Sequence, residues 1–227
     1  MHAIRTLVIS IGFIFTFLYS SSGQELDEHY RARIKGRPLF TPVLASDGNY
    51  FVAGSFDFFG VDLSGSILKI TPEGERAPGF TRIVTDGDIY SVVALNGGKF
   101  MAAGKFNRVN GVPTGKLVRF NADGSIDQTF SFNTSADIRH CSIQSTGKII
   151  VAGPFTDLMG RGYNNLARLN SDGSVDETFT KNQMQWPNRM HINDDNEILL
   201  NNVYSMMKLS ADGVIDPDFQ VDLGPTI

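Results

Sequence analysis

The chain has 227 residues, a formal net charge of −4 and a single cysteine. The apolar fraction of 41% and the charged fraction of 19% are typical of a globular protein and exclude a wholly disordered chain. The acidic balance disfavours a nucleic-acid partner, and one cysteine excludes an intramolecular disulfide framework and a cysteine-based zinc site.

Residues 1–23 have the pattern of a secretory signal peptide. Arg5 precedes an apolar run over residues 7–19, which is shorter than the about 20 residues that span a bilayer. Ser21 and Gly23 are small enough for the −3 and −1 subsites of signal peptidase. We therefore predict a secreted protein (periplasmic, extracellular or on the cell surface) with no membrane span in the mature chain. An uncleaved N-terminal anchor is the alternative.

A polar N-terminal arm over residues 24–39 is expected to lead into a repeat region, 40–223. The segment 52–56 (VAGSF) recurs at 102–106 (AAGKF) and 151–155 (VAGPF), with a degraded copy, LNNVY, at 200–204. Self-similarity at a fixed period of 49 or 50 residues indicates a repeat architecture. The approximate copies are 40–80, 81–130, 131–179 and 180–219.

A second repeated block follows in the same phase. LVRFNADGSIDQTF at 117–130 matches LARLNSDGSVDETF at 166–179, and looser copies occupy 67–80 and 206–219. The fourth copy is shorter, because nine residues are missing from the loop that joins its two blocks. The Asn-x-Asp-Gly-Ser stretches fit hairpin turns better than calcium loops, since EF-hand spacing is absent.

Each copy is predicted to contain three or four short strands. Apolar runs such as 99–103 and 148–152 follow glycines that suit tight turns, and Asp-Gly pairs mark a second hairpin. No mature segment of 12 or more residues shows helical periodicity with caps. We expect an all-β, β-propeller-like array of about four antiparallel blades of ~50 residues, which is the size of a blade.

The stretch from Gly147 to Phe155, continued by 166–179, resembles the delta-60 repeat family of β-propellers. The resemblance implies a propeller and a secreted or surface location in bacteria, but no particular reaction. Copy four departs from the pattern with Asn201-Asn202 in place of Ala-Gly, and copy one with Ala77 in place of an acid. Four copies either close into a small ring or belong to an incomplete, truncated array.

Two recurring features suggest roles. A basic residue in each copy could bind anions in a channel, although pairing with a recurring acid of the same blade is favoured. These residues are Lys69, Arg119, Arg168 and Lys208, with Asp127, Asp176 and Asp216 as the acids.

Cys141 falls in an apolar register, so a buried thiol is expected. His140 and His191 lack a partner at metal-ligand spacing, so we expect no metal and no cofactor.

The copies differ most in one loop, at 57–66, 107–116 and 156–165. Repeat proteins place binding differences in such loops, although drift of surface loops is the simpler explanation. The residues that could hold a ligand there are Phe58, Phe59, Arg108, Asn110, Arg161 and Tyr163.

Three functions are compatible with these patterns. The first is a non-catalytic module that binds a protein or a glycan through its blade loops. The second is an extracellular carbohydrate-active hydrolase or lyase in the propeller cleft, with Asp88 and Asp137 at matching positions as the pair to inspect. The third is a fragment of a longer repeat array with no independent role.

Overall fold

The computed structural model describes residues 34–38, 42–58, 61–202 and 205–222. The predicted signal peptide, residues 24–33 of the predicted arm, and Phe59 lie outside the described residues.

The described chain consists of short strands, with two single 3-10 turns, η1 (Asn96–Gly98) and η2 (Leu158–Gly160). The prediction of an all-β protein is confirmed. The strands are β1 (Ile34–Pro38), β2 (Val43–Leu44), β3 (Tyr50–Phe58), β4 (Val61–Ile70), β5 (Ile89–Ala94), β6 (Phe100–Gly104), β7 (Arg108–Val109), β8 (Val112–Pro113), β9 (Leu117–Phe120), β10 (His140–Ile143), β11 (Ile149–Ala152), β12 (Leu166–Leu169), β13 (Arg189–Ile192), β14 (Ile198–Asn201), β15 (Ser205–Leu209) and β16 (Ile215–Asp222).

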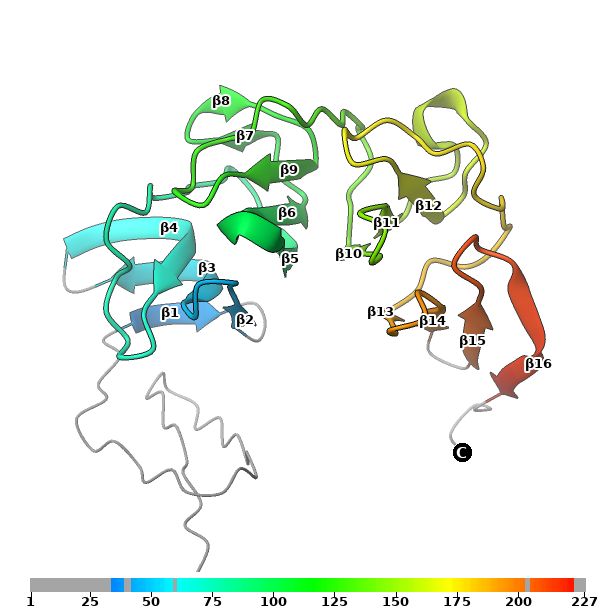
Figure 1. The fold of residues 1–227 in the computed structure, drawn as a ribbon. Helices are drawn as coiled ribbons and strands as arrows, with labels where there is room; N and C mark the ends of the chain where they lie inside the picture. The colour runs from blue at the N-terminus through cyan, green and yellow to red at the C-terminus, as the bar shows by residue number, and fades with distance from the viewer. Residues whose placement is uncertain (1–33, 39–41, 59–60, 203–204, 223–227) are drawn as a thin grey trace, which may run out of the picture.

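Four antiparallel sheets of three or four strands follow one another along an open arc, and they correspond to the four sequence copies (Figure 1). A two-stranded sheet, β7–β8, lies within the loop of blade 2. Blade 1 contains β2, β3 and β4, blade 2 contains β5, β6 and β9, and blade 3 contains β10, β11 and β12. Blade 4 contains β13 to β16. The sheets do not close into a ring among the described residues, as an incomplete propeller requires.

The first strand of each blade lies on the inner side of the arc (Figure 1). Strand β2 contacts β5, β5 contacts β10, and β10 contacts β13. Blade 1 carries one addition, because β1 pairs with the second half of β3. Residues 34–38, at the end of the predicted arm, are therefore part of a sheet.

The Asp-Gly turns pack against the preceding blade. A side chain on Gly124 would place its Cβ 2.7 Å from the carbonyl oxygen of Thr81, and one on Gly173 would lie 2.4 Å from that of Ser131. Both glycines also have φ values near +90°, which other residues rarely adopt. Glycine is thus required in these turns by the close contact between blades as well as by the hairpin conformation.

The recurring basic residues are paired with acids inside their own blades, as predicted. Arg119 contacts Asp127 at 2.8 Å, Arg168 contacts Asp176 at 2.9 Å, and Lys208 contacts Asp216 at 3.0 Å. In blade 1, where Ala77 replaces the acid, Lys69 instead contacts Asp47 at 2.7 Å. Each base also lies over the closing phenylalanine of its copy, at 5.1–6.0 Å from the ring centroid: Phe80, Phe130, Phe179 and Phe219.

Cys141 is 3% exposed and lies in the core between blades 2 and 3. Its sulfur is 3.5 Å from the hydroxyl of Ser91, which comes from β5. Burial raises the pKa of the Cys141 thiol to about 11, although the Ser91 contact opposes this shift. The prediction of a buried thiol is confirmed.

Candidate functional site

In blade 2 the variable loop, 107–116, folds over the linker that leads into the same blade. The side-chain amide of Asn110 holds the two together. Its oxygen accepts a hydrogen bond from the backbone N–H of Val84 at 2.8 Å, and its nitrogen donates to the carbonyl of Arg82 at 3.0 Å. Both polar groups of Asn110 are therefore used within the chain.

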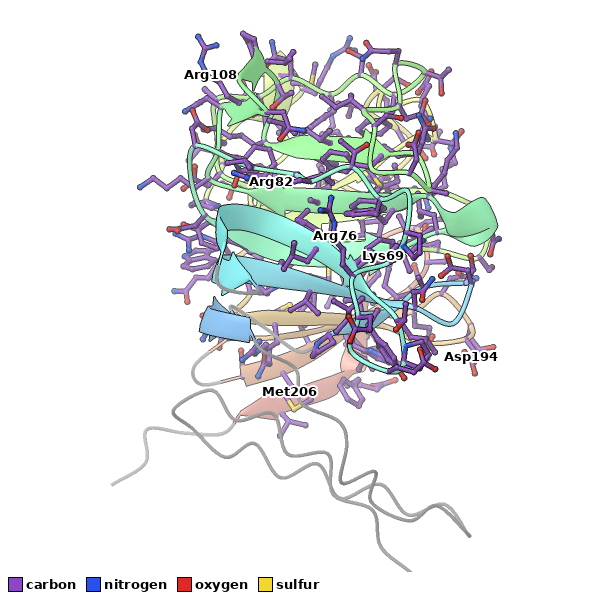
Figure 2. All side chains as sticks on the ribbon, turned by 90° about the vertical axis from the view of Figure 1, so that its left-hand side faces the viewer. Lys69, Arg76, Arg82, Arg108, Asp194 and Met206 are labelled. Carbon is purple, nitrogen blue, oxygen red and sulfur yellow. The ribbon has the colours of Figure 1, made fainter. Side chains whose placement is uncertain are left out.

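Arg108 begins the β7–β8 hairpin of the same loop and is exposed. Its guanidinium donates to the carbonyl of Gly111 at 2.8 Å. Figure 2 shows Arg108 at the upper edge of the molecule, whereas Lys69 and Arg76 lie together on blade 1. Arg108 faces solvent there and not the inner side of the arc.

In blade 3 the corresponding loop, 156–165, has one buried and one exposed candidate residue. Tyr163 is fully buried, and its hydroxyl lies 2.9 Å from the carbonyl oxygen of Asp176. Arg161 is exposed and forms an ion pair with Glu177. Tyr163 therefore belongs to the core and does not present a surface for a ligand.

Blade 4 lacks nine residues of this loop in the sequence, and β14 is followed directly by Asn202. In blade 3 the equivalent residue is Gly153, where an added Cβ would lie 2.2 Å from the carbonyl oxygen of Asp137. In blade 4 this position carries a side chain, Asn202, and the linker bonds to the preceding residue, where the N–H of Asn188 donates to the carbonyl of Asn201 at 2.8 Å.

A pocket of about 680 Å³ lies at this place, between blades 3 and 4. It combines the single tryptophan, Trp186, which is 39% exposed, with a set of amide side chains. None of the described residues that line it carries a charge. They are Thr156, Asn164 and Asn165 from blade 3, Gln183, Met184, Gln185, Trp186 and Asn188 from the linker, and Asn202.

Hydrogen bonds hold the blade 3 side of the pocket against the linker. The amide nitrogen of Asn165 donates to the carbonyl of Met184 at 2.6 Å, and that of Asn164 donates to the side chain of Gln183 at 3.2 Å. The side-chain oxygen of Asn164 is buried and has no hydrogen-bond partner.

Two other pockets of the described residues offer less chemistry. One of about 480 Å³ is formed by residues 76–81, and one of about 390 Å³ lies between 133–136 and 154–159. Neither combines an exposed aromatic ring with several amide groups. The pocket around Trp186 is therefore the best candidate site in the described part of the chain.

Basic and imidazole groups lie beside this pocket on the inner strands. His140 of β10 is half-buried, and burial lowers its pKa. The charges of Arg189 and Arg139 lower it further, against the opposing effect of backbone carbonyls in the linker. His140 is therefore neutral at pH 7, and the two arginines carry the local positive charge.

The predicted loop residues are not brought together by the fold. Arg108 and Asn110 lie on blade 2, and Arg161 and Tyr163 lie on blade 3 but do not line the Trp186 pocket. Phe58 ends β3, and nothing is described of its side chain. The loop 156–165 does contribute to the pocket, through Thr156, Asn164 and Asn165.

Sequence reasoning missed the linker residues 183–188. Three signals were present: a single tryptophan, the replacement of Ala-Gly by Asn201-Asn202, and the loss of nine loop residues in copy four. Each of these signals is a departure from the repeat that can be seen in the sequence. The sequence does not show that the three features lie at one pocket.

Asp88 and Asp137 occupy equivalent places in blades 2 and 3. The carbonyl of Asp88 accepts from Lys105 at 2.8 Å, and that of Asp137 lies against Gly153. The equivalent residue in blade 4 is Trp186.

In the described residues no helix is long and apolar enough to cross a membrane, and no group of three or more His, Cys, Asp or Glu side chains is placed to hold a metal ion.

A family model described as "Domain of unknown function (DUF5122) beta-propeller" matches residues 98–130 and 144–179, which are parts of blades 2 and 3. No curated protein matches this chain. The fold and the family match together define a β-propeller repeat protein. The more specific name, delta-60 repeat, stays a prediction.

Solved propeller structures are similar to this chain at low sequence identity. Virginiamycin B lyase from Staphylococcus aureus has a TM-score of 0.55 at 13% identity, over 99% of this chain and 71% of its own. The extracellular domain of a putative hybrid two component system from B. thetaiotaomicron has a TM-score of 0.56 at 11% identity, over 98% and 31%.

A structure of streptogramin B lyase has a TM-score of 0.53 at 12% identity, over 81% of this chain. The chain spans 54% of the length of that protein. At these identities the likeness concerns the fold alone.

Proposed function

We propose that this protein is a secreted or cell-surface, non-catalytic binding module that takes a glycan in the pocket between blades 3 and 4. The observation that carries the proposal is the exposed ring of Trp186 within a wall of asparagine and glutamine side chains. This class of ligand was one of two expected from the sequence, the other being a protein.

Carbohydrates match this lining chemically. The C–H face of a sugar ring packs on an aromatic ring, and amides both donate to and accept from sugar hydroxyls. A mostly preformed hollow with a few placed polar groups is the usual form of a small-molecule site.

The proposal is tested by presenting the full chain to an oligosaccharide array and measuring the affinity of each hit by titration calorimetry. Trp186→Ala should weaken binding at least about tenfold, because the aromatic anchor of a site carries much of its binding energy. Binding of no oligosaccharide, or unchanged binding by the variant, would contradict the proposal.

A second variant separates the site from the fold. Transplanting the loop of blade 3, residues 157–165, into the turn after Asn202 should cover the linker of blade 4 and remove binding. Insertion of the same residues between Gly48 and Asn49, an exposed turn of blade 1, is the control and should leave binding intact.

The alternative function, a carbohydrate-active hydrolase or lyase, is supported by the matching positions of Asp88 and Asp137. Glycosidases use a pair of carboxylates that flank the scissile bond. Asp88→Asn with Asp137→Asn should then abolish release of reducing ends from polysaccharides. If the unaltered chain binds a glycan without cleaving it, the binding function is favoured.

A further inference from the structure

Arg139 lies where three blades meet. It directly precedes β10 of blade 3, and the central carbon of its guanidinium is 4.0 Å from the ring centroid of Tyr90 in β5. The same carbon is 5.6 Å from the ring centroid of Trp186, the aromatic residue of the pocket. This guanidinium therefore stands beside the proposed glycan site.

Its charge is not neutralised by an acid in the described part of the chain. Arg119 and Arg168, in contrast, each contact an aspartate of their own blade. Asp137 is two residues from Arg139 but forms no ion pair with it. The Nε atom of Arg139 is buried and has no hydrogen-bond partner.

Ring contacts do not replace these missing partners. The N–H groups of a guanidinium lie in its plane, and a cation–π contact does not satisfy them. A buried donor without an acceptor costs free energy, and the cost is larger near an uncompensated charge. The terminal nitrogens of the half-buried Arg139 form no hydrogen bond with the described residues, and an anion beside the guanidinium would supply acceptors for them.

A second arginine near Arg139 adds to the positive charge. Arg189 begins β13 and is exposed, and it acts on His140 together with Arg139. The inner side of blades 3 and 4 thus has a positive region at the edge of a neutral, amide-lined pocket.

We propose that the glycan bound here carries a carboxylate, as hexuronic acids do, and that Arg139 receives that carboxylate. This inference rests on the proposed function. The planar fork of arginine matches a carboxylate with two parallel hydrogen bonds. The sugar ring packs on Trp186, and its hydroxyl groups reach the amides of Asn164 and Gln183.

The experiment compares each acid with a neutral ester, which lacks the charge and carries one added methyl group per carboxylate. The probes are trisaccharides of galacturonate, glucuronate and mannuronate, each with its neutral methyl ester, titrated into the full chain at low and high salt. At low salt at least one acid should bind about tenfold or more tightly than its own ester, since hydrogen bonds to charged groups are the stronger ones. High salt should reduce this ratio.

Variants of Arg139 show whether its guanidinium causes the preference for acids over esters. Arg139→Gln should bring the ratio of acid to ester affinity close to one, and Arg139→Lys should restore part of it. Arg76→Gln removes a charge from the far blade, where that side chain donates to the carbonyl of Phe80, and it should keep the full ratio. Thermal unfolding of each variant shows whether the fold is retained.

The outcomes separate this inference from the function on which it rests. If esters bind as well as acids, or if folded Arg139→Gln keeps the preference for acids, the inference is wrong and glycan binding stands. If other neutral glycans bind but none of these acids does, the inference is again wrong. If no glycan binds at all, both are wrong.

Discussion

Blades 2 and 3 follow the repeat closely, whereas blade 4 departs from it, and the candidate site lies at the departures. In blades 2 and 3 a glycine allows close approach of the linker, at Gly104 and Gly153. In blade 4 the equivalent position is Asn202, the covering loop is short, and Trp186 is exposed. Regular repeats thus build the scaffold, and local loss of the repeat pattern opens a surface.

The ion pairs show the same contrast. The side chains of Arg168 and Asp176 are 7% and 5% exposed, whereas those of Lys208 and Asp216 are 26% and 29% exposed. Blade 3 is covered on both sides by neighbouring blades. Blade 4 has its neighbour on one side in the described chain, so its equivalent pair meets more solvent.

The largest expected effect comes from removing a buried acid. Asp176→Ala should lower the free energy of unfolding by about 3 kcal/mol, because it removes the buried carboxylate that Arg168 and Lys148 share and leaves Arg168 only its pair with the exposed Asp212. Asp216→Ala should have a much smaller effect, since exposed pairs contribute little. Urea denaturation of both variants measures this, and equal losses would remove the distinction between the blades.

A smaller effect is expected from adding one methyl group to blade 3. Gly153→Ala should destabilise by about 1–3 kcal/mol, because its Cβ would meet the backbone carbonyl of Asp137 at 2.2 Å. Gly147→Ala is the control for backbone strain alone, with φ of +80° and open space around it. Urea denaturation again gives the comparison, and a neutral Gly153→Ala would show that the linker can move there.

Acid should destabilise the fold through the buried acids of blades 2 and 3. The hydrogen bond from Lys99 holds the pKa of Asp127 far below its usual value. Burial alone would raise the pKa of Asp176, but hydrogen bonds from Thr178 and Lys148 outweigh it and lower that pKa as well. A lowered folded-state pKa stabilises the fold above the unfolded value of 3.8 and ceases to do so as pH falls below it.

The free energy of unfolding should therefore change little between pH 7 and about 5 on account of these two acids and fall as pH drops through 3.8. Urea midpoints measured across this range test the expectation. Asp127→Asn should flatten the dependence, and an unchanged slope would mean that other groups control acid unfolding.

The smallest expected effect concerns the thiol between blades 2 and 3. Because Cys141 is buried and its pKa is raised to about 11, it should not react with a thiol reagent in the folded chain. One thiol should become reactive in urea. Rapid reaction under native conditions would show that the junction of blades 2 and 3 opens readily.

Much of the fold could be predicted from sequence because its determinants recur. The spacing of Gly104 and Gly153, the Asp-Gly turns and the closing phenylalanines each mark the same place in every blade. The ion pair between Arg168 and Asp176 could be predicted because a base and an acid recur together at the same places in the copies. The additional strand β1 could not be predicted, because it has no counterpart in the repeat.

The candidate site was predicted in part. The variable loop 156–165 supplies three lining residues, but Tyr163, chosen from that loop as a ligand-binding residue, is buried in the core. An aromatic residue in a loop does not reveal by itself whether its ring faces solvent or the next strand. The burial of Tyr163 is decided by the carbonyl groups that surround its hydroxyl.

The sequence by itself determined the repeated blade, its turns and the acid and base that stabilise it, because these contacts lie within one period or between equivalent places in neighbouring copies. Only the tertiary structure decided that Asn164, Trp186 and Asn202 share a pocket and that Tyr90 and Trp186 both contact Arg139. These residues are far apart in the chain and break the repeat. Their contacts depend on how the blades pack around the arc, and no local sequence pattern predicts that packing.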